Sequence, residues 1–294
     1  MSNNKMLISL KIGTAFAKVM PRKIGISLAK YAAYIFSLFP TGLKSNVEEI
    51  HKIISPSLNK AELNKRVRNV FAYYAAYWFD VFWLSSPRRK DDIDKIVVLE
   101  GSAHLAQANK KAKEQNSGVI LALTHLGSFE LAGAWLAGTG ENPLVVAERL
   151  EPPELFELFT NTRKVAGMEV VAHDDNPTSK LISALKENRY VCLVADRDIT
   201  GSGLSHVFFN KEKNMPQGPA SLAYLTKAVI LPVATYLNHD ATVSIVFYPE
   251  LEMQKGNDKK EVIYNTSQKL FSIFEEMIKR DPEQYHVLQN EWKS

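Results

Sequence analysis

A histidine and a glutamate in this chain have a spacing that suits acid–base catalysis. His125 stands two residues after the apolar segment 118–123, and Glu130 comes five residues after His125. A neutral imidazole takes up a proton near neutral pH, and a carboxylate on its other ring nitrogen orients the ring and stabilises the imidazolium. We therefore expect His125 to be a general base that Glu130 orients. The alternative is a capping or buried histidine without a catalytic role.

Further charged residues follow other strand candidates. They are Glu148, Arg149, Asp196, Arg197 and Asp198, with Arg163 on a helix candidate between the two groups. The carboxyl ends of parallel strands meet at one edge of a sheet, so a parallel sheet would bring these side chains into one cleft. A guanidinium there stabilises an oxyanion or binds a phosphate. We expect Arg149, Arg163, Arg197 and Asp198 to bind substrate, unless each belongs only to a solvated or salt-bridged loop.

Several kinds of site are excluded by the sequence. There is no Gly-x-Ser-x-Gly nucleophile elbow, glycine-rich dinucleotide loop or P-loop. Cys192 is the single cysteine and lies inside the apolar segment 190–195, so we interpret it as a core residue and expect no disulfide. His125, Glu130, His173 and Asp174 have no spacing that links them as metal ligands. We therefore expect neither a metal nor a cofactor.

The segments that must position these residues alternate between strand and helix from about residue 91 onwards. Strand candidates are 96–100, 118–123, 144–147, 169–172, 190–195, 206–209, 229–236 and 242–247. Helix candidates are 104–115, 129–136, 154–166, 179–187, 219–227 and a closing amphipathic segment that includes 262–278. This alternation predicts an α/β fold with a mostly parallel central sheet flanked by helices. We expect residues 91–294 to form one continuous domain.

The first 90 residues have a different character and are predicted to be helical. Pro21, Pro40 and Pro56 interrupt them, and Ser57 or Asn59 is a candidate helix cap. The first 47 residues hold seven basic residues and no acidic one, whereas the remainder has a net charge of −3, within a total of +4. A basic, apolar segment on a mildly acidic body favours contact with an anionic membrane surface over nucleic acid.

No segment is long enough to be an obvious membrane span. The uncharged stretch 31–43 has 13 residues and contains a proline, whereas a spanning helix needs about 20 apolar residues. We expect short helices that lie at a membrane interface, with plain soluble helices as the alternative. The aromatic segment 70–84 is apolar on nearly every side. It is predicted either to pack in the core or to form an aromatic wall for an acyl chain or a membrane.

Taken together, the charged motifs resemble the bacterial lipid A biosynthesis acyltransferase family, which includes the phosphatidylinositol mannoside acyltransferases. The resemblance covers about residues 10–292, and the segment 195–203 is similar to the mannoside acyltransferase branch. It is carried by His125-x4-Glu130, Glu148-Arg149, Arg163 with Gly167, Asp196-Arg197-Asp198, Met215-Pro216-Gln217-Gly218-Pro219 and Pro282-Glu283-Gln284-Tyr285.

The resemblance implies a glycerolipid-acyltransferase-like fold and an enzyme that transfers a fatty acyl chain from acyl-CoA or acyl carrier protein to a hydroxyl of a glycolipid. The reaction would take place at the cytoplasmic face of the inner membrane, with the protein attached peripherally or monotopically. His125 would be the base, Glu130 its partner and Arg163 the group that holds an oxyanion or a phosphate, with Arg149, Arg197 and Asp198 shaping the cleft. Direct attack by the acceptor hydroxyl needs no acyl-enzyme.

Two other functions remain open at this point. A glycerophospholipid acyltransferase of the lysophosphatidic acid type shares the histidine and acid spacing, typically with Asp where this chain has Glu130. A non-catalytic lipid-binding peripheral membrane protein would use the aromatic segment 70–84 to hold an acyl chain without consuming a thioester.

Overall fold

The N-terminal region consists of four helices. The computed structural model describes residues 3–39, 41–86 and 92–292. The helices are α1 (Asn3–Val19), α2 (Arg22–Phe36), α3 (Gly42–Ile54) and α4 (Lys60–Leu84). Pro21 separates α1 from α2 and Pro56 separates α3 from α4, as predicted, whereas Pro40 lies outside the described residues. Within those ranges, no helix is both long and apolar enough to cross a membrane.

Of the two cap candidates, Asn59 is the N-cap of α4. Its side-chain oxygen accepts hydrogen bonds from the backbone N–H groups of Ala61 and Glu62, at 2.9 and 3.0 Å. The Glu62 carboxylate in turn accepts a hydrogen bond from the Asn59 N–H at 2.9 Å. This reciprocal capping box satisfies N–H groups that have no partner within the helix, so the start of α4 is determined locally.

The remainder of the chain is a layered α/β fold, as the alternation predicted. The seven-stranded sheet has the order β1-β9-β8-β2-β5-β3-β4, and its strands are parallel except that β9 and β1 run antiparallel to the other five. The strands of this sheet are β1 (Val97–Glu100), β2 (Val119–Leu123), β3 (Leu144–Ala147), β4 (Glu169–Ala172), β5 (Tyr190–Val194), β8 (Val229–Leu237) and β9 (Val243–Phe247). The helices are α5 (Ile93–Ile96), α6 (Ser102–Glu114), α7 (Phe129–Gly138), α8 (Pro153–Val165), α9 (Thr178–Lys186), α10 (Gly218–Thr226) and α11 (Lys259–Arg280).

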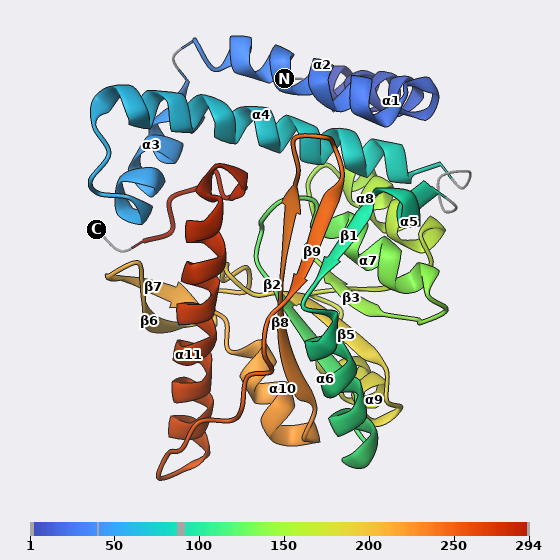
Figure 1. Cartoon of the computed structure of the whole chain (residues 1–294), viewed down its shortest axis with the longest axis vertical. Coiled ribbons are helices and arrows are strands. Elements are labelled where there is room, and N and C mark those ends of the chain that lie inside the picture. Colours follow the sequence, from blue (N-terminus) through green and yellow to red (C-terminus); the bar gives the residue numbers. More distant parts are fainter. Residues whose placement is uncertain (1–2, 40, 87–91, 293–294) are drawn as a thin grey trace.

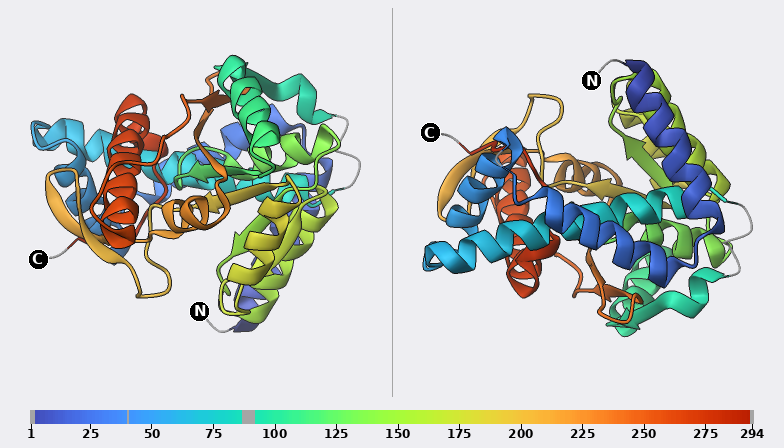
Figure 2. Two further views of the ribbon diagram at one scale, coloured as in Figure 1. Left: turned by 90° about the horizontal axis from the view of Figure 1, so that it is seen from below. Right: turned by 90° about the horizontal axis from the view of Figure 1, so that it is seen from above.

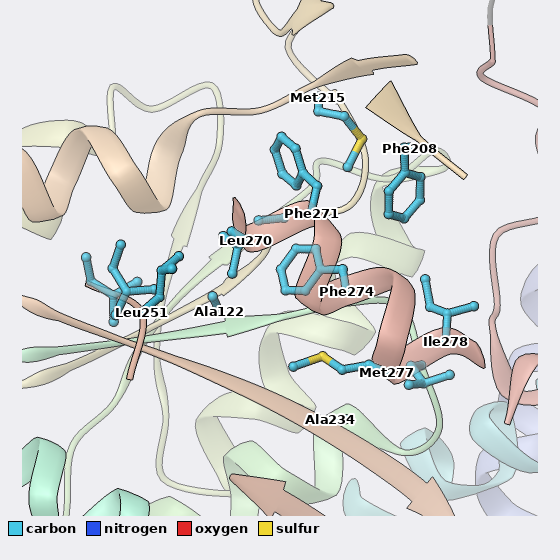
Figure 3. Packing of buried hydrophobic residues seen from close by; sticks show 14 of the residues in the cluster. Ala122, Phe208, Met215, Ala234, Leu251, Leu270, Phe271, Phe274, Met277 and Ile278 are labelled. Carbon is cyan, nitrogen blue, oxygen red and sulfur yellow. The ribbon is translucent and has the colours of Figure 1, made fainter. Parts of the chain in front are cut away.

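Both faces of the sheet are covered. Ile120 and Ala122 of β2 pack in a cluster with α9, α10 and α11, whereas Leu121 and Leu123 pack on the opposite face with α6 and α7. Side chains alternate between the two faces of a strand, so a strand buried on both sides reads as a continuous apolar run. Figure 3 shows the first cluster, in which the apolar stripe of α11, Phe274 among it, faces the sheet.

One strand was missing from the prediction. Instead of a single strand at 206–209, the structure has a hairpin of β6 (Leu204–Phe208) and β7 (Lys211–Met215), which form a separate two-stranded sheet. Phe209 and Asn210 turn the chain with φ angles of 54° and 58°, as a tight two-residue hairpin requires. The sequence of β7, Lys-Glu-Lys-Asn-Met, has no apolar alternation to reveal it.

The N-terminal helices lie across one end of the α/β body, and α4 packs against α7 and α8 (Figures 1 and 2). The ring of Tyr77 on α4 stacks on Phe129 at the start of α7, with the ring centroids 4.9 Å apart. Phe129 follows β2 by a short loop, so α4 covers the end of the sheet at which the parallel strands finish. The aromatic residues of α4 therefore lie where an α/β sheet carries its active site.

Candidate active site

Charged residues from three strands meet at the carboxyl edge of the sheet. β5 is hydrogen-bonded to β2 on one side and to β3 on the other, all three in parallel. His125 follows β2, Asp196 follows β5 and Glu148 follows β3. The convergence expected for a parallel sheet is therefore confirmed.

The partner of His125 is Asp196, and the expected contact with Glu130 is absent. The Nδ1 atom of His125 lies 2.7 Å from Oδ1 of Asp196, and the His125 backbone N–H donates to Oδ2 at 3.2 Å. The register pairs Leu123 with Val194, so two residues further along each strand the histidine and the aspartate stand side by side. The prediction of Glu130 as the partner is therefore wrong, because it rested on proximity along the chain, whereas the strand register determines the pairing.

The electrostatic surroundings keep Asp196 ionised. The side chain is fully buried, and burial by itself would raise the pKa, but the opposing interactions with His125 and Lys213 lower the pKa of Asp196 to about 2. An ionised carboxylate accepts hydrogen bonds only, so Nδ1 of His125 carries the proton and Nε2 has a free lone pair. Nε2 has no hydrogen-bond partner among the described residues, and His125 lines a cavity. The dyad therefore has the form of a general base with its orienting acid.

Glu130 forms a buried ion pair with Arg163 instead. Nη2 and Nε of Arg163 donate to the two carboxylate oxygens of Glu130 at 2.6 and 3.0 Å. The Tyr77 hydroxyl donates to the same carboxylate at 3.4 Å. Burial opposes the charged form, but Glu130 outweighs it and raises the pKa of Arg163. Nη1 of Arg163 has no hydrogen-bond partner among the described residues. Glu130 thus fixes the guanidinium of Arg163 at the cavity wall, with the Nη1 donors left available to a ligand.

The loop that carries His125 is held by the C-terminal segment. The His286 backbone N–H donates to the His125 carbonyl at 2.7 Å, and Nε2 of His286 donates to the Gly127 carbonyl at 2.9 Å. The Gly127 N–H in turn donates to the Gln284 carbonyl at 3.0 Å. Gly127 has φ of +61°, and a Cβ atom there would lie 2.1 Å from the carbonyl oxygen of Thr235. Only glycine fits this turn. The Pro-Glu-Gln-Tyr block and the following His286 therefore support the backbone of the His125 loop.

A second buried network joins this loop to the N-terminal helices. Arg22 of α2 donates through Nε and Nη2 to the Asp80 carboxylate of α4 at 2.7 and 2.8 Å, and Ser128 donates to the same carboxylate at 2.7 Å. Arg22 also donates to the Ala241 carbonyl. Asp80 and Ser128 are almost completely buried. The loop from His125 to Glu130 is thus tied through α4 to α2.

A cavity opens beside His125. Its volume of about 620 Å³ lies within the range of pockets that bind small molecules. We refer to it as the catalytic cavity. Arg163, Arg197 and Glu148 line it, together with Tyr74, Tyr77 and Trp78 of α4 and apolar residues of α8, α9 and α10. Other aromatic residues of α4, such as Phe79, are buried in the core. The prediction that the aromatic segment packs in the core is therefore confirmed for part of α4. The prediction that it forms a wall for an acyl chain or a membrane stays a prediction, with three aromatic residues of α4 lining the cavity.

A smaller apolar cavity of about 50 Å³ adjoins the catalytic cavity and shares Phe129, Val146, Arg163 and Val194 with it. Cys192 lines this smaller cavity, and burial raises the pKa of its thiol to about 12. The thiol is therefore protonated at neutral pH and is no nucleophile there.

Two of the four expected substrate-binding residues do not line the catalytic cavity. Arg149 is exposed and donates to Asp174 at 2.7 Å and to Asp175 at 3.2 Å, so its guanidinium is directed to a surface loop. Asp198 accepts hydrogen bonds from Gly203 N–H at 2.8 Å and from Thr200 at 3.3 Å. It closes a loop, and the cavity wall contains Thr200 and Ser202 of that loop rather than Asp198.

Arg197 lies on the cavity wall but is held by carboxylates. Its Nε donates to Glu291 at 2.7 Å, and its Nη1 lies 3.7 Å from Glu148. Arg163 and Arg197 are therefore the expected substrate-binding residues that the structure brings to the cavity. Within the described ranges, no group of three or more His, Cys, Asp or Glu side chains is arranged to hold a metal ion.

Comparison with known proteins shows similarity to acyltransferases. Residues 6–294 match the family described as bacterial lipid A biosynthesis acyltransferase. The phosphatidylinositol mannoside acyltransferase of Mycolicibacterium smegmatis is 34% identical over 232 residues, which cover 77% of this chain and 72% of that protein. A phosphatidylinositol mannoside acyltransferase of Mycobacterium tuberculosis is 32% identical over 225 residues, which cover 74% of this chain and 67% of the relative.

Among solved structures, a 1-acyl-sn-glycerophosphate (LPA) acyltransferase, PlsC, from Thermotoga maritima aligns over 87% of this chain and 99% of that one. The TM-score is 0.36 and the sequence identity is 15%. A similarity of this size carries no weight for the fold, which is defined by the strand order of the sheet itself.

Proposed function

The chain belongs to the bacterial lipid A biosynthesis acyltransferase family, and from this premise we propose that it transfers a fatty acyl chain from acyl-CoA or acyl carrier protein to a hydroxyl of a membrane glycolipid, with His125 as the general base. The observation that carries the proposal is the His125–Asp196 pair at the edge of a cavity with aromatic and apolar walls. Such walls suit a fatty acyl chain, and a base beside them suits an attack by a hydroxyl.

In the proposed reaction, Nε2 of His125 takes the proton of the acceptor hydroxyl as its oxygen attacks the thioester carbonyl. The ionised Asp196 stabilises the imidazolium that forms, through the 2.7 Å contact to Nδ1. Collapse of the tetrahedral intermediate breaks the carbon–sulfur bond, and the imidazolium returns the proton to the leaving thiolate. The products are the ester and the free thiol, and no acyl-enzyme forms.

Arg163 is the proposed electrophilic partner of the base. Its guanidinium is held by Glu130 at the wall that separates the two cavities, and Nη1 is left to donate. A donor fixed in this way stabilises the oxyanion of the intermediate or binds a phosphate of donor or acceptor. Glu130 then acts on the reaction through Arg163 and not through His125.

We also propose that the protein attaches to the cytoplasmic face of the cell membrane through α1, α2 and the following turn. Of the 20 large hydrophobic side chains that are exposed among the described residues, 11 lie between residues 12 and 43, including Val19 at 80% and Ile24 at 52% exposure. A patch of this kind, on a segment rich in lysine, suits an anionic lipid surface. A Val19→Glu, Ile24→Glu variant should lose binding to anionic vesicles. Unchanged binding would contradict the assignment.

These point substitutions test attachment better than deletion of residues 1–40. The deletion would also remove Arg22 and leave Asp80 buried without its counter-charge. Loss of vesicle binding by an unfolded protein would then carry no information about the surface.

The relatives at 32 and 34% identity support an inositol mannoside lipid as the acceptor. Lysophosphatidic acid remains the alternative acceptor. Family membership removes the support for a non-catalytic lipid-binding protein. An acceptor panel of phosphatidylinositol mannosides, lipid A precursors and lysophosphatidic acid decides between them, with thiol release and mass spectrometry of the lipid product as readouts.

The test of the base uses His125→Asn. The amide nitrogen of Asn takes the place of Nδ1 and still donates to Asp196, so the buried carboxylate keeps a partner while the base is lost. We expect transfer to fall by about 10²–10⁴-fold. Asp196→Asn should cause a comparable loss with the imidazole present, because the amide no longer stabilises the imidazolium. Retained turnover in His125→Asn would remove His125 from the mechanism.

A further inference from the structure

A second cavity of about 620 Å³ lies between α1, α2 and α4, outside the site described above. We call it the α2–α4 groove. Its walls are aliphatic and aromatic side chains, glycine and alanine, without a charged residue. It is lined by Gly13, Phe16, Gly25, Leu28, Ala29, Ala32, Ala33, Phe36, Leu43, Phe71, Tyr74, Ala75, Trp78, Phe79, Phe82 and Leu288. A groove of this size and chemistry fits a hydrocarbon chain.

Small residues on α2 create the groove. Gly25, Ala29 and Ala32 follow one another at intervals of three or four residues and so share one face of the helix. At the closest approach, a Cβ atom on Gly25 would lie 2.0 Å from the ring of Phe79, so the two helices cross in contact there. Towards the end of α2 the alanines leave the space open.

The groove is adjacent to the catalytic cavity. Tyr74 and Trp78 of α4 line both spaces. They stand four residues apart and therefore lie one above the other on the helix, as a wall with the groove on one side and the catalytic cavity on the other. The Tyr74 ring lies 5.9 Å from the ring of His286, whose N–H binds the carbonyl of His125. A lipid in the groove would therefore have its head group near the base.

The rim of the groove opens onto the exposed apolar face of the N-terminal helices. Leu28 is 49% exposed, Phe36 is 59% exposed and Leu43 is 48% exposed. Contact of these apolar side chains with water is unfavourable, whereas contact with lipid chains is not. The groove thus connects the proposed membrane surface with the wall of the catalytic cavity.

We propose that the α2–α4 groove binds one acyl chain of the glycolipid acceptor while the head group reaches past Tyr74 and Trp78 to His125. The proposed reaction places both the thioester carbonyl and the acceptor hydroxyl beside His125. The donor's chain begins at that carbonyl and so lies in the catalytic cavity, whereas the head group separates the acceptor's chains from the reacting hydroxyl. The lipid anchor of the acceptor is the remaining hydrocarbon, and it approaches from the membrane. This inference rests on the proposed function.

The test fills the groove with Ala32→Trp. Ala32 is exposed and lines the groove, so a larger side chain there enters the groove without disturbing the core. Ser27→Trp is the matched control, because Ser27 is exposed on the same helix but does not line the groove. Acyl transfer is measured in mixed micelles with an intact phosphatidylinositol mannoside and in solution with its deacylated, water-soluble counterpart.

We expect Ala32→Trp to raise KM for the intact lipid about tenfold, the effect of two methylene groups losing apolar contact. Its kinetics with the deacylated acceptor should equal those of the wild type, and Ser27→Trp should change neither. An equal KM for the intact lipid in both variants, or an equal loss with the deacylated acceptor, would overturn the inference.

A binding measurement separates this inference from the proposed function. A phosphatidylinositol mannoside with a photoreactive diazirine in one acyl chain is crosslinked to the wild-type protein, and the labelled residues are identified by mass spectrometry. Labels on Phe71 or Ala75, which line the groove and not the catalytic cavity, support the inference even if no transfer is observed. Labels confined to the catalytic cavity overturn it even if transfer is fast.

Discussion

The buried contact between Arg22 and Asp80 leads to a quantitative prediction for Asp80→Asn. The side chains of Arg22 and Asp80 are 6% and 1% exposed, and the carboxylate accepts two hydrogen bonds from the guanidinium and one from Ser128. Removal of one partner leaves a buried charge without compensation, which costs about 3–5 kcal/mol. For a domain of this size, this corresponds to a decrease in Tm of roughly 6–20 °C.

Two companion variants show where that free energy comes from. Ser128→Ala removes a single hydrogen bond to a charged group and should cost about 1.5–3 kcal/mol. The double variant Arg22→Met, Asp80→Leu removes both charges together, so it should recover most of the stability that Asp80→Asn loses. Because Ser128 then has no acceptor, the recovered protein should still turn over more slowly than the wild type.

The assays are thermal and urea unfolding followed by circular dichroism, with acyl transfer measured on the same samples. A loss below about 1 kcal/mol for Asp80→Asn would contradict a buried pair, because that is the range of exposed ion pairs. A double variant as unstable as the single one would also refute the reasoning, since it would show that charge isolation is not the cause.

Two further predictions concern pH. Both ring nitrogens of His51 are buried without a hydrogen bond. Burial, with a smaller effect of Arg66, lowers the pKa of His51 from 6.5 to about 3. Below pH 6.5, the unfolded chain therefore binds a proton at His51 that the folded chain does not bind. About 2 kcal/mol of stability is lost at pH 5 in this way, and His51→Phe should abolish that loss in urea midpoints at pH 7 and 5; an unchanged difference would disprove the assignment. Glu130→Gln should lower kcat by misplacing Arg163 but keep the wild-type pH–rate profile, whereas a shifted profile would show that Glu130 acts on His125 after all.

Local signals in the sequence determined most of the elements. The apolar runs of β2 and β5 and the capping box of Asn59 depend on neighbouring residues only, so they could be predicted from the chain alone. β7 was missed because its residues are mostly polar, and its place as a strand depends on the two-residue turn and on pairing with β6. Strand candidates without apolar residues need a partner to be recognised.

The position of Arg149 illustrates a second limit. A charged residue directly after a strand is a reasonable candidate for a site, but whether its side chain enters the cleft depends on competing partners. Asp174 and Asp175 follow β4, the edge strand next to β3, and they bind the Arg149 guanidinium at the surface. The two aspartates lie close to Arg149 because β4 is next to β3 in the strand order, which the sequence does not reveal.

The sequence by itself determined that His125 stands at the end of a buried strand and that acidic and basic residues follow the other strands. Only the tertiary structure decided which carboxylate pairs with His125. Asp196 is 71 residues away along the chain, yet β2 and β5 are neighbours in a register that brings it within 2.7 Å of Nδ1. Glu130, five residues away, belongs to Arg163 of α8. The physical reason is that hydrogen bonding between strands, and not distance along the chain, determines which side chains meet at the edge of the sheet.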